Sequence, residues 1–511
     1  MERAAPIRQP YRPEAVISRT TPEPVSGRPR RAPAAAPAGE AAAEPVAAPG
    51  PASATRTGVA APPAVAGAGS AARDRAVWAP PVFAACAVGL WGIGRGGSLW
   101  RDESVTVQVA HRPLGDLLGL LGEVDAVHGL YYLLMHGVFA LWDGGPTALR
   151  LPSVLGSALA AAGVAATGRL LAGPRAGLTA GLLYAVLPPL QMYAQEGRSY
   201  ALVAAAVVWS GYFLLRARWT AYVLVLGLGC WLHEFAALAL LAHACGAWRI
   251  RAWRWSAALV LALVAPLAVV SARQAQAQLG WLGPPSWADW TAYGTVAGCG
   301  LLLARRADRG VARAALPLLL VPPGVLLVLS RAVHPWYVDR YVLYALAGLV
   351  LLAAARPWRW WAALLLALLV LPWSWWLRTP DSRKDDAPAA ARAVRELARP
   401  GDAVLFLPAR RREWLLSSPA VHASLDDVAL DRTPAASRTL QGTERPAADV
   451  RAAMLAAPRI VALSDPPDQP LDAVPAEAVK RRTLAADFEL CAVVEVRGAR
   501  VSLYARPGTC P

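Results

Sequence analysis

Long apolar runs dominate the hydrophobic pattern between about position 77 and position 377, with short polar stretches between them. Several of these runs approach the roughly 20 residues that a transmembrane helix needs. The pattern therefore predicts an α-helical polytopic membrane protein. We expect about eleven spans, at residues 77–94, 149–171, 176–193, 199–215, 219–232, 235–248, 256–271, 292–304, 314–330, 341–355 and 361–377.

Two further stretches carry apolar residues but do not fit a span. Residues 105–121 place Gln108, His111 and Arg112 among leucines and valines, which predicts an amphipathic helix lying in the membrane interface. Residues 130–142 are strongly apolar, but a run of only 13 residues is short for a span. We expect an interfacial or re-entrant helix there.

The placement of arginines decides the orientation of the predicted spans. With residues 130–142 left out of the count, arginine clusters fall in every second loop, whereas all of them would face outward if that segment spanned. Cytoplasmic loops carry an excess of arginine and lysine, so we expect a cytoplasmic amino terminus and an extracytoplasmic carboxyl terminus. The clusters are Arg169 and Arg175; Arg216 and Arg218; Arg249, Arg251 and Arg254; Arg305, Arg306, Arg309 and Arg313; and Arg356 and Arg359.

The two ends of the chain differ from the apolar middle, residues 77–377. Residues 1–76 are rich in Pro, Ala, Gly and Arg without apolar periodicity, which predicts a disordered cytoplasmic tail. Residues 378–511 mix polar, helical and strand-like stretches, which predicts a small extracytoplasmic α/β domain. Within it we expect a helix at 388–397 and strands at 403–407, 459–463, 490–496 and 501–505, the last two paired.

Composition narrows the class of protein. The chain has 511 residues, of which 56% are hydrophobic and 17% charged, and this excludes an ordinary soluble protein. The net charge of +16 reflects arginines in loops, so it does not indicate nucleic-acid binding. The strong preference for Arg over Lys and the abundance of Ala are typical of a bacterial chain, and we expect the bacterial plasma membrane.

The six cysteines include no CxxC spacing, which excludes a zinc ribbon or a thioredoxin-like redox motif. Four of the six lie in apolar runs, where a buried thiol is the ordinary interpretation. Cys491 and Cys510 lie in the carboxyl-terminal domain. An oxidising compartment would allow them to form a disulfide, and the sequence leaves this open.

Unusual polar residues gather on one face of the predicted topology. Because apolar length and arginine placement alone set that topology, the clustering is informative. Each group also has an ordinary interpretation: solvated loop charges for Asp102 and Glu103, an interface anchor for Arg340, and a satisfied polar turn, which we favour, for His233-Glu234. The outer loops hold Asp102, Glu103, Asp125 and His128; Gln195, Glu196, Arg198 and Tyr200; His233 and Glu234; and His334, Asp339, Arg340 and Tyr341.

Several short motifs follow one another along this apolar region. The acidic pair of the first outer loop is followed by His128 and Tyr131-Tyr132, and Arg340-Tyr341 comes late. Over about residues 77–377 the chain resembles the C-type membrane glycosyltransferases, in the bacterial branch related to protein O-mannosyltransferases and the lipid A aminoarabinose transferase. The other matching stretches are Arg150-Leu151-Pro152-Ser153, Leu183-Tyr184-Ala185-Val186-Leu187-Pro188 and Gln195-Glu196-Gly197-Arg198-Ser199-Tyr200-Ala201-Leu202.

The resemblance implies inverting transfer of a sugar, such as mannose or arabinose, from a polyprenyl-phosphate donor to a hydroxyl acceptor on the outer face of the membrane. The acceptor would be a cell-envelope glycan, a lipid or a protein, and no cofactor is implied. Asp102 matches the family's base and Glu103 is the second catalytic candidate. Where relatives carry a His-Pro-Pro-type sequence, this chain has Val127-His128-Gly129-Leu130. The candidates for binding the donor and its phosphate are Arg198, Arg340, Tyr341, His334, Glu196 and His128.

Other functions predict different patterns. A transporter or lipid flippase should carry charged residues near the bilayer midplane, often in two related halves. Here the middle of each predicted span is nearly free of charge, and no internal repeat is visible. A membrane scaffold that displays the carboxyl-terminal domain would need no role for Asp102. The scattered His and acidic residues lack HExxH-type spacing, so we expect no metal site.

Overall fold

The computed structural model describes residues 68–279, 282–356, 360–472 and 474–510. Of the predicted disordered tail at 1–76, residues 1–67 lie outside the described residues. The first described element is helix α1 (Ala68–Leu90), which begins ahead of the predicted first span and contains most of it. A 3₁₀ turn, η1 (Arg95–Gly97), follows α1 and leads into the first acidic loop.

The predicted helical membrane fold is confirmed. Four segments among the described residues are long and apolar enough to cross a membrane: Val77–Gly97, Pro146–Ala172, Arg251–Ala275 and Arg309–Ala332. Shorter apolar helices accompany them, so the count of eleven spans and their orientation stay predictions. The helices after α4 (Gly129–Leu141) are α5 (Pro146–Ala172), α6 (Pro174–Val186), α7 (Pro188–Ala194), α8 (Tyr200–Leu215), α9 (Trp219–Leu232), α10 (Ala239–Ala247), α11 (Arg251–Leu279), α12 (Trp287–Ala304), α13 (Arg309–Ala332), α14 (Leu346–Ala354) and α15 (Trp360–Trp376).

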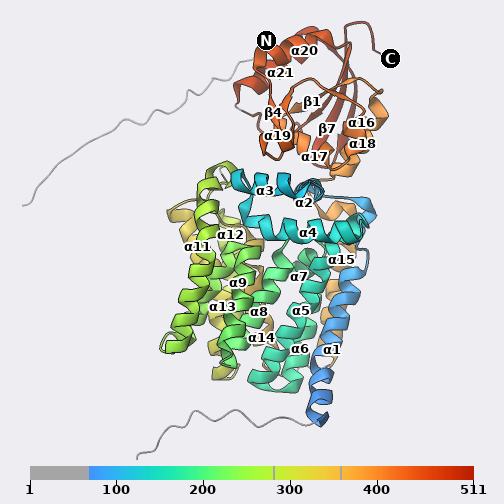
Figure 1. The fold of residues 1–511 in the computed structure, drawn as a ribbon. Helices are drawn as coiled ribbons and strands as arrows, with labels where there is room; N and C mark the ends of the chain where they lie inside the picture. Colours follow the sequence, from blue (N-terminus) through green and yellow to red (C-terminus); the bar gives the residue numbers. More distant parts are fainter. Residues whose placement is uncertain (1–67, 280–281, 357–359, 473, 511) are drawn as a thin grey trace, which may run out of the picture. The chain divides into compact units, whose positions relative to one another are not determined.

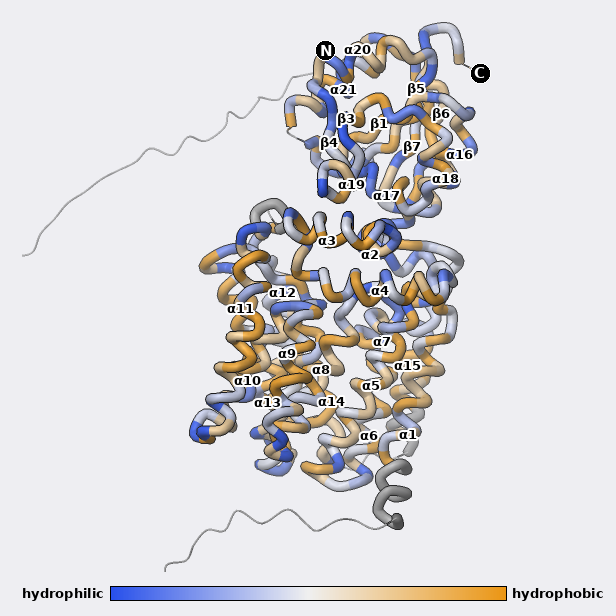
Figure 2. The backbone as a smooth tube through the Cα atoms, viewed as in Figure 1, coloured by the Kyte–Doolittle hydropathy of each residue, from blue (hydrophilic) through white to orange (hydrophobic). Residues whose placement is uncertain are grey.

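Small residues allow the helices around α5 to pack closely. A Cβ at Gly156 would lie 2.9 Å from the backbone nitrogen of Leu202 in α8, and one at Gly168 would lie 3.1 Å from Cα of Gly177 in α6. Small residues at such contacts are typical of helix packing in membranes. Figure 2 shows hydrophobic residues concentrated along helices such as α5, α9 and α13.

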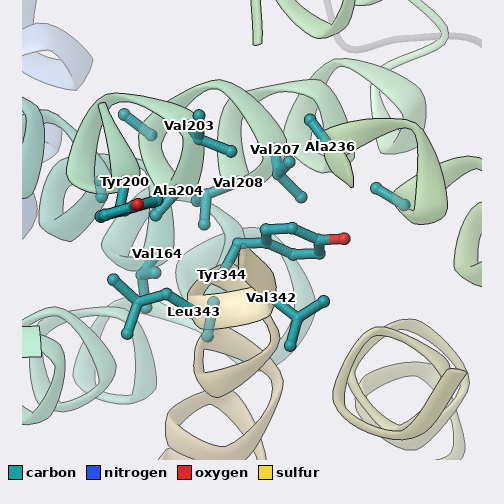
Figure 3. Close-up of a cluster of buried hydrophobic side chains, with 14 of the residues drawn as sticks. Val164, Tyr200, Val203, Ala204, Val207, Val208, Ala236, Val342, Leu343 and Tyr344 are labelled. Atoms are coloured by element: carbon teal, nitrogen blue, oxygen red, sulfur yellow. The ribbon is translucent and has the colours of Figure 1, made fainter. Parts of the chain in front are cut away.

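A cluster of buried side chains joins α5 and α8 to the 3₁₀ segment η4 (Asp339–Ala345) that precedes α14. In Figure 3, Val207 of α8 lies close to Tyr344 of η4, and Val164 of α5 lies close to Leu343 of η4. All four side chains are buried. This packing anchors the end of η4, and Arg340 and Tyr341 lie about one turn earlier in the same segment.

The predicted amphipathic helix at 105–121 is two helices, α2 (Arg101–Ala110) and α3 (Leu114–Glu123). The break falls at Pro113, because proline lacks an N–H and disfavours helical geometry in the residue before it. The segment predicted not to span forms α4 (Gly129–Leu141), which follows a short turn, η2 (Ala126–His128). Figure 1 shows α3 and α4 running crosswise to the long helices such as α5.

The carboxyl-terminal region contains the predicted α/β domain. Its five-stranded sheet has the order β2-β1-β5-β7-β6, with β1 parallel to β2 and β5 and the other pairs antiparallel. The predicted pairing of the last two strands is confirmed. The strands are β1 (Ala403–Leu407), β2 (Asp426–Asp427), β5 (Arg459–Ser464), β6 (Glu489–Val496) and β7 (Ala499–Ala505), and β3 (Leu430–Arg432) pairs with β4 (Thr443–Glu444) outside this sheet.

Helices cover both faces of this sheet. Apolar residues of α16 (Ala387–Leu397) and α17 (Arg412–Leu416) form one core with the sheet. Residues of α20 (Ala447–Ala456) and α21 (Pro475–Asp487) form the other, and the short helices α18 (Pro419–His422) and α19 (Pro434–Ser437) complete the domain. Cys491 and Cys510, the pair that the sequence left open, form a disulfide.

Candidate active site

The first turn of α2 carries the two acidic residues, Asp102 and Glu103. Negative side chains are stabilised near a helix N-terminus, where unpaired backbone N–H groups carry partial positive charge. Glu103 also caps the helix, because its Oε2 accepts a hydrogen bond from the backbone N–H of Trp100 at 3.4 Å. Successive residues of a helix point about 100° apart, so the two carboxylates enter different surroundings.

The Glu103 carboxylate is completely buried and is held by a fixed set of donors. Arg150 donates from Nε to Oε1 and from Nη2 to Oε2, both at 2.7 Å, and the N–H of Gly197 donates to Oε1 at 2.9 Å. Burial alone raises the pKa of Glu103, but Arg150 and the other donors outweigh it and lower the pKa to about 2. Glu103 is therefore an ionised anchor for α2, which argues against the catalytic role predicted for it.

Asp102 lies in a more open position than Glu103. Its side chain is 25% exposed, and its Oδ2 lies 3.5 Å from Nη2 of Arg340, whose side chain is 18% exposed. The structure therefore brings together two of the predicted site residues from opposite ends of the apolar region. Both groups keep part of their surface open to a ligand.

Aromatic rings surround the Arg340 guanidinium. Its Cζ lies 5.4 Å from the ring centre of Trp100, 5.6 Å from that of Tyr200 and 5.7 Å from that of Tyr341. Nε of Arg340 also donates a hydrogen bond to the Tyr200 hydroxyl at 3.1 Å. These cation–π contacts orient a planar guanidinium in a way that they would not orient a lysine ammonium.

Two buried histidines lie beside this aromatic group. The ring centre of His233 is 4.4 Å from that of Tyr341 and 5.5 Å from that of His128. Nδ1 of each histidine is buried without a hydrogen-bond partner among the described residues. Burial, and then the charges of Arg198 and Arg340, lowers the pKa of His233 to about 3, so the ring is neutral near pH 7.

The interpretation of His233-Glu234 as a satisfied polar turn holds for only one of the two residues. Glu234 accepts a hydrogen bond from Ser271 at 3.0 Å, as a satisfied turn would require. His233 instead points its ring into the site and leaves Nδ1 without a partner among the described residues. The hydrophobic pattern carries no sign of this difference, because it depends on which residues distant in sequence surround the loop.

Arg198 lies over the ring of Tyr132, which is also next to the ring of His128. Its Nη1 donates to the Tyr132 hydroxyl at 3.2 Å and to Thr106 Oγ1 at 3.4 Å, while its Nε is buried without a partner among the described residues. Tyr132 in turn donates to the carboxylate of Asp125. Glu196, two residues earlier in the chain, has a different partner, because its carboxylate faces Arg383.

Glu196 is buried and faces Arg383, which lies beyond the last predicted span. Nε of Arg383 is 3.8 Å from Oε2 of Glu196, and Oε1 is buried without a hydrogen-bond partner among the described residues. Burial raises the pKa of Glu196 to about 7, and Arg383 only partly opposes this effect. Arg383 could not be predicted from the sequence, because no motif connects it with the second outer loop, which holds Glu196.

His334 is the one predicted site residue that no contact within the described ranges joins to the rest. Its Nδ1 is hydrogen-bonded to the carbonyl oxygen of Pro335 at 3.2 Å, and its ring packs 5.6 Å from Trp336. The prediction that it binds the donor phosphate has no support here. Within the part of the chain that the structure describes, no group of three or more His, Cys, Asp or Glu side chains is placed to hold a metal ion.

Comparison with known proteins gives structural likeness only. No family model and no curated protein matches the chain. The structure is similar to ArnT from Cupriavidus metallidurans in the apo state, with a TM-score of 0.45 and 11% identity, covering 83% of this chain and 97% of that one. It is also similar to the same protein bound to undecaprenyl phosphate, with a TM-score of 0.38 and 14% identity over 87% of this chain and 99% of that one.

A third similar structure is the arabinosyltransferase EmbB from Mycobacterium smegmatis, with a TM-score of 0.40 and 14% identity. The match covers 72% of this chain and 42% of that one. All three TM-scores are below 0.5.

Proposed function

We propose that this chain is a membrane glycosyltransferase that moves a sugar from a polyprenyl-phosphate donor to a hydroxyl acceptor on the outer face of the membrane. The observation that carries the proposal is the pair formed by Asp102 and Arg340, 3.5 Å apart and both partly exposed. Such a transfer needs a base for the acceptor proton and a cation for the departing phosphate. This pair supplies both groups side by side.

In the proposed reaction the acceptor oxygen attacks the anomeric carbon of the donor sugar. The bond between that carbon and the phosphate oxygen breaks, and the phosphate leaves with the bonding electrons. Asp102 takes the hydroxyl proton of the acceptor. A single displacement of this kind inverts the anomeric centre.

Arg340 and Arg198 are the proposed phosphate ligands. When the donor phosphate binds Arg340, it replaces Asp102 as the partner of the guanidinium, and this frees the carboxylate to act as base. The buried Nε of Arg198, which has no partner among the described residues, gives a second donor. The charges of both arginines act on His128 and His233, whose rings lie 5.5 Å apart, and these neutral rings add hydrogen-bonding capacity without further charge.

Glu103 has a positioning role in this proposal rather than a catalytic one. Its bonds to Arg150 and Gly197 tie the first turn of α2 to α5 and to the second outer loop. Asp102 is the next residue along the same turn, so the direction of its carboxylate depends on this anchor. Mannose and arabinose are the proposed sugars, and a cell-envelope glycan, lipid or protein is the proposed acceptor.

The test is transfer from radiolabelled polyprenyl-phosphate mannose and polyprenyl-phosphate arabinose in membranes that contain wild-type protein or Asp102→Asn. Loss of a general base costs ~10²–10⁴-fold, so we expect at least a hundredfold loss at equal expression. Asp143→Asn is the matched control, because Asp143 is an exposed aspartate outside the candidate site. Its Oδ2 lies 3.2 Å from Nε2 of His111.

Transfer by Asp102→Asn at the wild-type rate would contradict the role of Asp102 as base. Absence of transfer by the wild type with either donor would contradict the proposed enzyme. A lipid transport assay on the same membranes would then test the flippase alternative.

A further inference from the structure

Helix α2 makes contacts with two regions of the chain, the carboxyl-terminal domain and the apolar helical region. Arg101, Ser104 and Gln108 of α2 follow the spacing i, i+3 and i+7, which places them on one helix face, and Arg112 lies just beyond the end of the helix. All four donate hydrogen bonds to the carboxyl-terminal domain, at distances from 3.1 to 3.4 Å. The acceptors are Glu413 Oε2 and the carbonyl oxygens of Glu413, Leu440 and Thr439.

Other side chains of α2 point toward the apolar helices. Glu103 binds Arg150, and Thr106 donates to the carbonyl oxygen of Gly197 at 3.1 Å. The candidate base, Asp102, comes directly after Arg101 in the first turn. The rotation of this turn is therefore set from two sides, by Glu103 on one and by the carboxyl-terminal domain on the other.

Glu413 of α17 differs from the two charged residues that come directly before it in the chain. Arg411 and Arg412 pair with Asp465 and Asp427, which belong to the same carboxyl-terminal domain. Glu413 instead reaches out of that domain to Nε of Arg101 at 3.3 Å. The Glu413 side chain is only 2% exposed, whereas that of Arg101 is 38% exposed. A buried carboxylate is costly without a partner, so this contact holds Arg101 in one position.

We propose that Glu413 is a positioning residue for Asp102, through which the carboxyl-terminal domain orients the base of the site. The inference rests on the proposed glycosyltransferase function. Glu413 fixes Arg101, Arg101 fixes the first turn of α2, and the first turn presents Asp102 to Arg340 at 3.5 Å. The carboxyl-terminal domain then helps to position the catalytic base of the site.

The kinetic test compares wild type, Glu413→Gln, Arg101→Gln and the double variant in the full chain. Small displacements of a catalytic group are costly, so we expect Glu413→Gln to lower kcat about tenfold while KM for the donor stays within twofold. Because both residues act through one contact, the double variant should lose no more than the worse single variant. Glu413→Asp should restore part of the rate.

Asp465→Asn is the matched control, since it removes a carboxylate that pairs only within the carboxyl-terminal domain. It should lower the unfolding temperature and leave kcat per folded molecule unchanged. If Glu413→Gln behaves in the same way as Asp465→Asn, Glu413 is a structural residue only and the proposal is overturned.

Hydrogen exchange of the α2 backbone amides separates failure of this inference from failure of the proposed function. Glu413→Gln should increase exchange in the first turn of α2, whether or not the protein transfers sugar. If the wild type is inactive but exchange rises, the enzyme proposal fails while the positioning contact stands. Unchanged exchange together with an unchanged rate overturns the inference.

Discussion

Arg150 and Glu103 form a two-bond ion pair, with both N–O distances at 2.7 Å, in which neither side chain has any exposed surface. Removing one member of a buried pair leaves the other as an uncompensated charge, at a cost of about 3–5 kcal/mol. Arg150→Ala should therefore destabilise the protein by this amount, measured by unfolding in detergent. Arg175→Ala removes an exposed arginine and should leave the stability nearly unchanged.

The pair of Arg150 and Glu103 also predicts that the stability of the protein depends on pH in the acidic range. The folded pKa of Glu103, about 2, lies below the value of ~4.3 expected in an unfolded chain. The stabilising contribution of Glu103 is thus present above pH ~4.3 and is lost as pH falls toward 2. In Glu103→Gln the free energy of unfolding should depend less on pH over this acidic range. An unchanged slope would contradict the ionised state that we assign to Glu103.

The contribution of Glu196 to stability should change with pH in the opposite direction from that of Glu103. Its folded pKa of about 7 exceeds the unfolded value, so its contribution to stability is present below pH ~4.3 and is lost as pH rises through 7. Glu196→Gln should raise the unfolding temperature more at pH 8 than at pH 4. Glu123→Gln, which changes an exposed glutamate at the end of α3, should not show this difference.

Arg340 should not tolerate replacement by lysine. A lysine keeps the charge but loses the planar contacts with Trp100, Tyr200 and Tyr341, so we expect Arg340→Lys to lower kcat/KM for the donor about tenfold. Arg331→Lys changes an exposed arginine near the end of α13 and serves as the control. Equal kcat/KM values for the two variants would argue against a role for the guanidinium shape.

The disulfide between Cys491 and Cys510 should stabilise the carboxyl-terminal domain. It closes a loop with a sequence separation of 19, for which chain entropy predicts about 3 kcal/mol. A reducing agent should lower the unfolding temperature of the wild type and have no such effect on the Cys491→Ser, Cys510→Ser variant. Cys299→Ser removes a free exposed cysteine and should respond to the reducing agent as the wild type does.

Apolar length predicts most of the helical elements between residues 77 and 377. The run at 219–232 coincides with α9, and the run at 199–215 differs from α8 by a single residue. The stretch at 176–193 is divided into α6 and α7 at Pro188, just as residues 105–121 are divided at Pro113. Both breaks are local effects of proline that outweigh the continuous apolar pattern.

The candidate site was only partly predictable, because its members meet through tertiary contacts. Asp102 and Arg340 were identified from sequence, and they lie together. Glu413 and Arg383 come from beyond the last predicted span, where no periodicity links them to the outer loops. His334 shares a loop with Arg340, but proximity in sequence did not bring its ring to the site.

The division of α2 between two partners also limits how its length can vary. Inserting one residue after Glu103 would rotate the following residues by about 100° about the helix axis. Ser104, Gln108 and Arg112 would then turn away from the carboxyl-terminal domain, while Glu103 stayed with Arg150. The number of residues between Arg101 and Arg112 is therefore constrained by the rotational phase of the helix, in addition to the identity of its side chains.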